Sequence, residues 1–268
     1  MNVVGCGTVC LGGDLPSKLQ AWRAAEGTGV EIWRDNLEGH RSTELRQALG
    51  SMKVINIQPL HNFAGVPPDK VADARTHASA FISEARYWDA AVLCCASTHL
   101  RTRPDLITND LQDLAHWAGL AGVEIWYEAL PWSRYDCTLP AAWERVQQVD
   151  RENVKLVIDT WHHLITGGDP GYVRRIPAAR VGLVQLSDLA REEPTIEELI
   201  GVARNERALI GDGFMAKPMK VIVDTLLDEG YGGPISAEVM SRPLRATDPD
   251  TAAQKIMAAL RQVVPTPS

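Results

Sequence analysis

The chain has 268 residues, of which 45% are hydrophobic, and a formal net charge of −7 at pH 7. This length and apolar content are enough for a sizeable core and suit one large domain, whereas the negative charge argues against nucleic-acid and anionic-membrane partners, which require a basic surface. No apolar run approaches the length of a membrane span. We therefore expect a cytoplasmic protein that acts on a small molecule, and the sequence leaves a homo-oligomer open.

Short β-branched runs alternate along the chain with longer helical patterns. Such alternation is typical of a parallel sheet that is covered by helices. The interiors of the runs are almost continuously apolar, as in residues 155–158, which indicates strands buried on both faces. The eight predicted strands are Gly5–Leu11, Gly29–Trp33, Val54–Gln58, Ala91–Cys95, Gly122–Glu128, Val154–Asp159, Gly182–Ser187 and Gly233–Glu238.

Helical periodicity fills the intervals between these strands. Asp14 stands where the first helix needs an N-cap, and Gly50 follows the second helix as a C-terminal residue. We expect Glu192–Glu198 to be a surface helix or loop. The other predicted helices are Pro16–Ala25, Ser42–Leu49, Pro68–Trp88, Asp110–Leu120, Pro140–Val149, Lys217–Asp228 and Asp250–Val264.

Eight strands that alternate with helices predict a (β/α)8 TIM barrel, in one domain that spans residues 1–268. An open, doubly wound sheet is the alternative, because sequence cannot show whether a sheet closes. In a barrel of this kind the active site lies at the carboxyl ends of the strands.

Polar residues stand at several of these strand ends. Glu31 is in strand two, and Gln58 ends strand three. A carboxylate that closes an apolar strand is costly to bury unless it is paired or bound to a metal. The alternative is a set of helix caps and ion pairs. The residues that we predict to converge as ligands at the ends of strands five to eight are Glu128, Asp159, Gln185 and Glu238.

Three carboxylates and one amide oxygen form a hard ligand set. Such a set suits one Mg²⁺, Mn²⁺ or Co²⁺ ion better than a structural zinc. The charge of three carboxylates exceeds that of a dication, so a substrate, a nearby arginine or a protonated group must offset the remainder. His162, three residues after Asp159, is a candidate acid, base or substrate donor. The alternative for His162 is a loop histidine that bonds the backbone.

Other common motifs are missing from the sequence. Gly5-Cys-Gly7 has no third glycine for a dinucleotide fingerprint, and there is no P-loop, G-x-S-x-G or H-E-x-x-H segment. Five cysteines without a C-x-x-C pair indicate reduced thiols.

Nine segments, spread almost from end to end, resemble the xylose-isomerase-like superfamily of barrels, which includes sugar phosphate isomerases and epimerases. Within it the chain looks closest to bacterial 3-dehydroshikimate dehydratases. The segments that carry the resemblance are Gly13–Gln20, Gly29–Trp33, Gln58–Gly65, Tyr127–Trp132, Asp159–His162, Gln185–Asp188, Ala203–Arg207, Gly211–Gly213 and Gly233–Glu238.

The resemblance implies roles for individual residues. It places the superfamily's metal ligands on the four strand-end residues named above, with Gln185 where epimerases usually have histidine. It places a histidine of the site on His162 and makes Arg204 and Arg207 candidates for substrate binding. Glu31, at its strand end, and His61 are further candidates for substrate binding. The chain departs from the dehydratases at His61, where they carry an arginine suited to a substrate carboxylate.

These residues predict a metal-dependent lyase that acts on a cyclic keto-polyol such as 3-dehydroshikimate. Removal of the proton next to a metal-bound ketone, followed by loss of a β-hydroxyl, gives dehydration. Return of the proton to the other face, or to the neighbouring carbon, gives an epimerase or isomerase, with Glu128 and Glu238 as paired bases. A metal-dependent endonuclease and a non-enzymatic binding barrel are further alternatives, which the acidic charge and the full ligand set disfavour.

Overall fold

A computed structural model describes residues 2–98, 103–190 and 194–264 of the chain. Eight parallel strands form one sheet in the order β1-β10-β7-β6-β5-β4-β3-β2. Gly7, just after β1, forms a parallel bridge with Glu31 of β2, so the two edges of the sheet meet in an almost closed barrel. The strands of this sheet are β1 (Val4–Cys6), β2 (Gly29–Trp33), β3 (Lys53–Leu60), β4 (Ala91–Cys95), β5 (Ile125–Glu128), β6 (Val154–Asp159), β7 (Val181–Leu186) and β10 (Ile235–Ala237).

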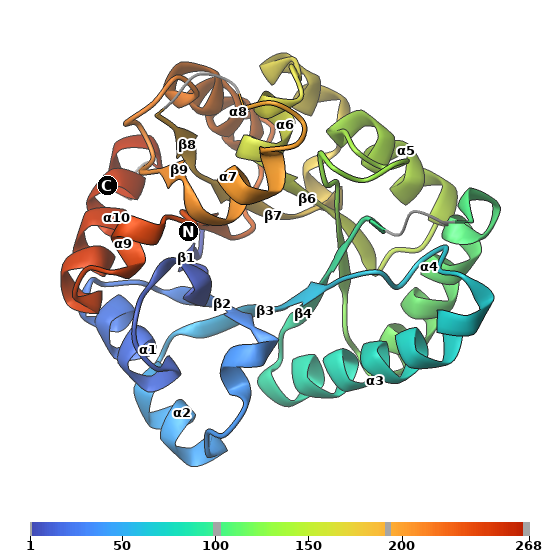
Figure 1. Ribbon diagram of the computed structural model, residues 1–268, viewed down its shortest axis with the longest axis horizontal. Coiled ribbons are helices and arrows are strands. Elements are labelled where there is room, and N and C mark those ends of the chain that lie inside the picture. Colours follow the sequence, from blue (N-terminus) through green and yellow to red (C-terminus); the bar gives the residue numbers. More distant parts are fainter. Residues whose placement is uncertain (1, 99–102, 191–193, 265–268) are drawn as a thin grey trace.

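Helices surround this barrel on the outside (Figure 1). The prediction of a TIM barrel is confirmed, and the open-sheet alternative is wrong. In the described part of the chain no helix has the length and apolar character needed to cross a membrane. The α-helices are α1 (Leu15–Ala24), α2 (Ser42–Leu49), α3 (Val71–Trp88), α4 (Pro104–Leu120), α5 (Leu139–Val149), α6 (Thr160–Ile165), α7 (Leu199–Asn205), α8 (Ala216–Asp228), α9 (Arg242–Arg245) and α10 (Pro249–Val263).

The first strand is shorter than its predicted span, Gly5–Leu11. After β1 the chain turns into a 3-10 helix over Thr8–Cys10, in which Cys10 N donates to the carbonyl of Gly7. The apolar character of this segment is the same in both conformations, so periodicity cannot separate them. The turn lies at the mouth of the barrel, next to the carboxyl end of β2.

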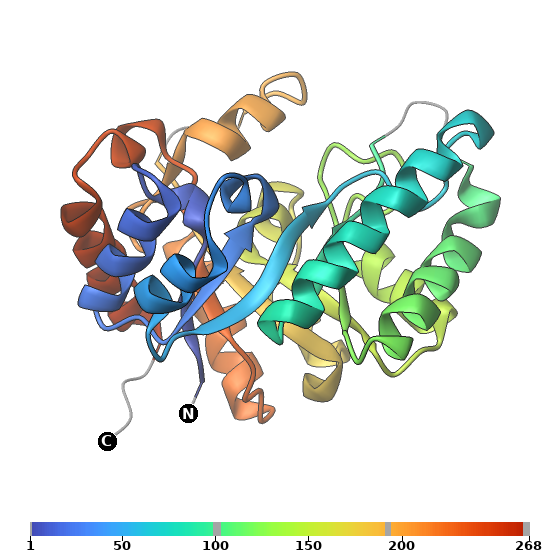
Figure 2. The same cartoon turned by 90° about the horizontal axis from the view of Figure 1, so that it is seen from below.

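Branched aliphatic side chains such as Ile57, Leu93 and Leu183 are completely enclosed in the hydrophobic core that surrounds the strands. A second apolar cluster lies above the barrel, where α7 packs on Trp161 of α6 through Leu199 and Val202. Figure 2 shows this α7 region at one end of the molecule and both termini at the opposite end.

Two short antiparallel strands, β8 (Asp188–Leu189) and β9 (Arg207–Ala208), connect the segments that follow β7 and α7. The carboxylate of Asp188 accepts hydrogen bonds from the backbone N–H groups of Gly211, Gly213 and Met215. A Cβ atom on Gly213 would come within 2.2 Å of the Leu189 carbonyl oxygen, so only glycine fits there. This ribbon brings Arg207 over the barrel mouth. Residues 192 and 193 of the predicted element Glu192–Glu198 lie outside the described residues.

Candidate metal centre and substrate cavity

Glu128 ends β5 with its carboxyl group inside the barrel mouth, where the side chain is almost fully buried. Oε2 accepts a hydrogen bond of 3.1 Å from the Cys95 thiol, and Oε1 has no hydrogen-bond partner among the described residues. Burial, reinforced by the nearby charge of Asp159, raises the pKa of Glu128 to about 8. A buried oxygen without a partner is costly, so this atom is available to a ligand.

Asp159 ends β6 and is at the same time the N-cap of α6. Oδ1 accepts from the backbone N–H groups of Trp161 and His162, at 2.8 and 3.3 Å. Oδ2 points the other way and lies 2.8 Å from Nη1 of Arg207. Burial alone would raise the pKa of this carboxyl, but Arg207 and His162 bring it below its ordinary value. Asp159 therefore caps α6 through Oδ1, as the alternative interpretation of helix caps expects, and also presents an ionised carboxylate at the barrel mouth.

Gln185 of β7 is oriented by Glu31, which lies deeper in the barrel. Nε2 of Gln185 donates to Oε2 of Glu31 at 2.9 Å, so Gln185 Oε1 is left without a partner in the described chain. Asn56 and Gln58 donate to the same Glu31 oxygen, at 2.8 and 3.2 Å. Glu31 is 0% exposed and does not line the cavity of the site. This position suits the orientation of Gln185 better than the substrate contact expected from the sequence.

Arg207 lies among the predicted ligands. Its Nη1 is 2.8 Å from Asp159 Oδ2 and 3.2 Å from Glu238 Oε2. Its guanidinium stacks over the Trp161 ring, with 4.9 Å between Cζ and the ring centroid. Burial opposes the charge, but Asp159 and Glu238 outweigh it and raise the pKa of Arg207. Burial raises the pKa of Glu238 well above its ordinary value, although Arg207 opposes this shift. Arg207 is thus the nearby arginine that offsets the excess of carboxylates.

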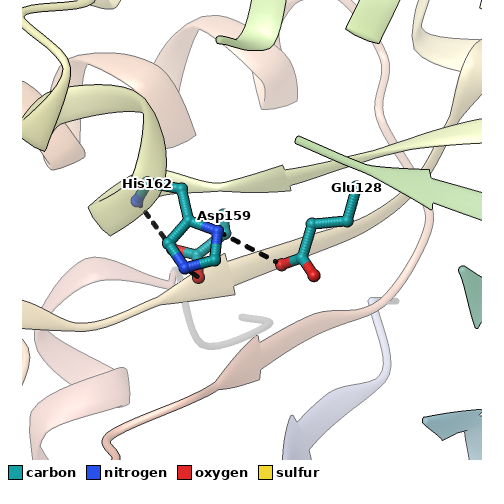
Figure 3. A group of neighbouring side chains, drawn as sticks. All are labelled: Glu128, Asp159 and His162. Atoms are coloured by element: carbon teal, nitrogen blue, oxygen red, sulfur yellow. Dashed lines mark hydrogen bonds and ion pairs between the residues drawn. The ribbon is translucent and has the colours of Figure 1, made fainter. Parts of the chain in front are cut away.

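His162 is a neutral imidazole with a fixed tautomer. An arginine can only donate, so Nε2 of His162 accepts from Arg207 Nη2 at 2.9 Å, and Nδ1–H donates to the Ala129 carbonyl at 3.1 Å. Burial lowers the pKa of His162 to about 4. Figure 3 shows its ring directed toward the carboxylate of Glu128, with 3.5 Å between His162 Nδ1 and Glu128 Oε1. The hydrogen bond to the Ala129 carbonyl agrees with the alternative interpretation of His162 as a loop histidine. The contacts with Arg207 and Glu128 agree with the expected place of His162 in the site.

The distances between these side chains, and their burial, show whether they could bind a divalent ion. Ligand atoms of Glu128, Asp159 and His162 all lie within 4.8 Å of one another and are buried. Glu128 Oε1 and Gln185 Oε1 are enclosed polar atoms without partners in the described residues. Hard oxygen donors that are desolvated and unpaired fit a dication. Arg207 holds the remaining predicted ligand oxygens, which belong to Asp159 and Glu238.

The remaining predicted residues line the walls above this centre. His61 follows β3, and Arg204 lies in the last turn of α7; both border the cavity that contains Glu128 and His162. Burial lowers the pKa of His61 to about 4, and the charge of Arg204 lowers it further. His61 is therefore neutral near pH 7. The sequence did not single out Trp132, whose ring meets the His162 imidazole edge-on at 5.3 Å, because nothing in its spacing relates it to His162.

The sequence profile described as xylose isomerase-like TIM barrel matches residues 19–263. The chain belongs to this family. A curated relative named 3-dehydroshikimate dehydratase, from Pseudomonas putida, is 31% identical over 247 residues, which are 89% of this chain and 38% of the relative. The chain therefore spans well under half the length of that relative.

Two solved structures extend the family comparison. A xylose isomerase-like TIM barrel/4-hydroxyphenylpyruvate dioxygenase fusion protein has a TM-score of 0.89 and 28% identity, and covers 98% of this chain and 43% of its own. The IolI protein with a bound zinc atom has a TM-score of 0.86 and 17% identity, and covers 98% of both chains. At the lower identity the likeness shows the shared fold.

Proposed function

We propose that this chain is a divalent-metal-dependent lyase that removes water from a cyclic keto-polyol such as 3-dehydroshikimate. The observation that carries the proposal is the buried group of Glu128, Asp159 and His162, with the unpaired oxygen of Gln185, at one mouth of the barrel. The name of the Pseudomonas putida relative supports the class of substrate.

In this proposal one Mg²⁺, Mn²⁺ or Co²⁺ ion is held by four residues, each within one residue of the end of a strand. When bound, the ion supplies Lewis-acid polarisation of the substrate ketone. Arg207 supplies the positive charge that three carboxylates need beyond that of a dication. The proposed ligands are Glu128, Asp159, Gln185 and Glu238.

His162 is the residue that we propose moves the proton. Its Nδ1–H is held by the Ala129 carbonyl, so the lone pair of Nε2 is available at the cavity once a substrate replaces the contact with Arg207. Nε2 takes the proton from the carbon next to the ketone, and the C–H electron pair forms the new C=C bond as the β C–O bond breaks. The departing hydroxyl then takes the proton from Nε2 and leaves as water. Trp132 and Trp161 pack against the ring edge-on and shield it from solvent.

Glu31 has a positioning role in this mechanism. It accepts hydrogen bonds from three amides and fixes which end of the Gln185 side chain points into the mouth. Partners of this kind, one layer beyond the ligands, commonly change metal affinity by about 10–100-fold.

A second candidate is an epimerase or isomerase of a keto-sugar or keto-cyclitol on the same site. It is favoured by burial, which raises the pKa of Glu128 to about 8 and that of Glu238 well above its ordinary value, so that each carboxyl binds a proton more readily than an exposed carboxyl does. Removal of a proton by one carboxyl and its return by the other inverts a carbon centre without loss of water.

The deciding experiment is an ultraviolet scan of metal-loaded protein mixed with 3-dehydroshikimate. A lyase produces a new aromatic absorbance, and His162→Ala should lower kcat by about 10²–10⁴-fold. His163→Ala is the matched control, because that ring is hydrogen-bonded to the Asp169 carbonyl outside the cavity. Incorporation of deuterium into a keto-sugar from D₂O, with no new absorbance from 3-dehydroshikimate, would instead support the epimerase.

A further inference from the structure

The inner cavity, which is lined by Glu128 and Glu238 among the proposed metal ligands, is too small for a whole substrate. Its volume is about 40 Å³, and Arg207 and Trp132 are among the side chains that line it. Sites for small molecules usually enclose about 300–1,000 Å³. A second, outer cavity of about 550 Å³ adjoins it. The two cavities share the walls formed by Trp33, Gln58, Pro59, His61, Arg204 and Met240.

The outer cavity is positively charged, although the chain as a whole is acidic. Arg34, Arg204 and Arg245 line it, and Asp35 is its one carboxylate. Burial lowers the pKa values of His61 and His77 on the same wall, so these two rings stay neutral near pH 7. Three guanidinium groups and one carboxylate leave two net positive charges in a chain whose net charge is −7. A concave patch of this sign concentrates anions.

The two arginines that are farther from the metal centre are held in place but incompletely paired. Arg34 has its guanidinium over the Phe81 ring at 5.4 Å, and its buried Nε has no hydrogen-bond partner in the described part of the chain. Arg245 donates through Nη2 to the Arg204 carbonyl and to Asn205 Oδ1, both at 3.0 Å, whereas its buried Nη1 has no such partner. Neither forms an ion pair with another described residue. Fixed guanidinium groups with free donors suit carboxylate or phosphate oxygens.

We propose that Arg34 and Arg245, with Arg204 at the junction of the two cavities, form an anion subsite for a carboxylate or phosphate group of the substrate. The inference rests on the proposed function, since the reacting ketone occupies the inner cavity. It explains how an acidic substrate is held although neutral His61 stands where the related dehydratases carry an arginine. The anionic group then lies on the β2 and α9 side of the mouth.

The test compares two ligands that differ only in charge. Manganese-loaded protein is titrated with 3,4-dihydroxybenzoate and with 3,4-dihydroxybenzamide, and binding is followed by calorimetry. The benzoate should bind at least about tenfold more tightly, which corresponds to about 1.4 kcal/mol. In the double variant Arg34→Met and Arg245→Met, the ratio of the affinity for the benzoate to that for the benzamide should fall to nearly one, while the affinity for the benzamide is unchanged. Arg86→Met, an exposed arginine of α3, is the matched control.

Equal affinities of the wild type for both ligands would overturn the proposal, and so would an unchanged preference in the double methionine variant. Melting curves verify that each variant is folded, and the double lysine variant at the same positions, which keeps both charges, should retain part of the preference. Inorganic phosphate distinguishes the two sources of the anion: a phosphate subsite lets it compete with the benzoate, and a carboxylate subsite does not. The calorimetric readout needs no turnover. A protein that does not convert 3-dehydroshikimate but still prefers the benzoate to the benzamide would contradict the proposed dehydration and would still support the anion subsite.

Discussion

The most informative perturbation of this molecule is Arg207→Met, which removes a buried cation and keeps the volume of its side chain roughly unchanged. Nη1 of Arg207 is 2.8 Å from Asp159 Oδ2 and 3.2 Å from Glu238 Oε2, and both carboxylates are buried. Loss of one partner from a buried ion pair costs about 3–5 kcal/mol, a large part of the roughly 5–15 kcal/mol that stabilises a typical domain. We expect a loss of that size in metal-free protein.

Addition of Mn²⁺ should reverse much of this loss, because a dication can neutralise the same oxygens. A metal present at about 100 times its dissociation constant adds about 2.7 kcal/mol to the free energy of unfolding. That gain should be larger in the variant than in the wild type, because the site without Arg207 carries one more unbalanced negative charge and attracts a dication more strongly. Urea unfolding followed by circular dichroism, with EDTA or with Mn²⁺, measures both quantities.

The matched control is Arg145→Met, which breaks an ion pair of 3.1 Å between Arg145 of α5 and Asp136, away from the proposed ligands. Its loss of stability should be the same with EDTA and with Mn²⁺. If the loss caused by Arg207→Met is likewise the same in both conditions, the carboxylates around Arg207 do not bind a metal and the reasoning is refuted.

Three further predictions follow from the site. Thorough chelation should abolish activity, and Mg²⁺, Mn²⁺ or Co²⁺ should restore it; full turnover by protein shown by elemental analysis to contain no metal would contradict this. Glu31→Leu should weaken metal binding by about 10–100-fold in a calorimetric titration, because the Gln185 amide loses the acceptor that orients it. An unchanged affinity would show that Glu31 only fills space. Burial lowers the pKa of His61 to about 4, so its NMR signals should not titrate between about pH 5.5 and 8. The unfolded chain binds the His61 proton at a higher pH than the folded chain does. The contribution of His61 to stability should therefore be complete above about pH 6.5 and decrease as the pH falls toward 4.

Much of the barrel could be predicted from the sequence, because strands buried on both faces are continuously apolar and helices carry their own periodicity. The strands Gly29–Trp33 and Ala91–Cys95 have the predicted bounds. The segment that follows β7 could not be predicted in the same way. The helix α7 packs on Trp161, and the carboxylate of Asp188 in β8 bonds the backbone of Gly213, so both features depend on contacts between segments that are far apart in the chain.

The sequence by itself determined which residues stand at the carboxyl ends of parallel strands, and the almost closed barrel brings Glu128, Asp159, Gln185 and Glu238 to one mouth. Only the tertiary structure decided how these side chains are paired. Arg207 enters the cluster of carboxylates through a ribbon between distant segments, and Glu31 lies beneath Gln185 rather than in the cavity. The guanidinium groups of Arg34 and Arg245 share one cavity although 211 residues separate them in the chain (245 − 34). Charge pairing depends on distance in space, which local propensities do not encode.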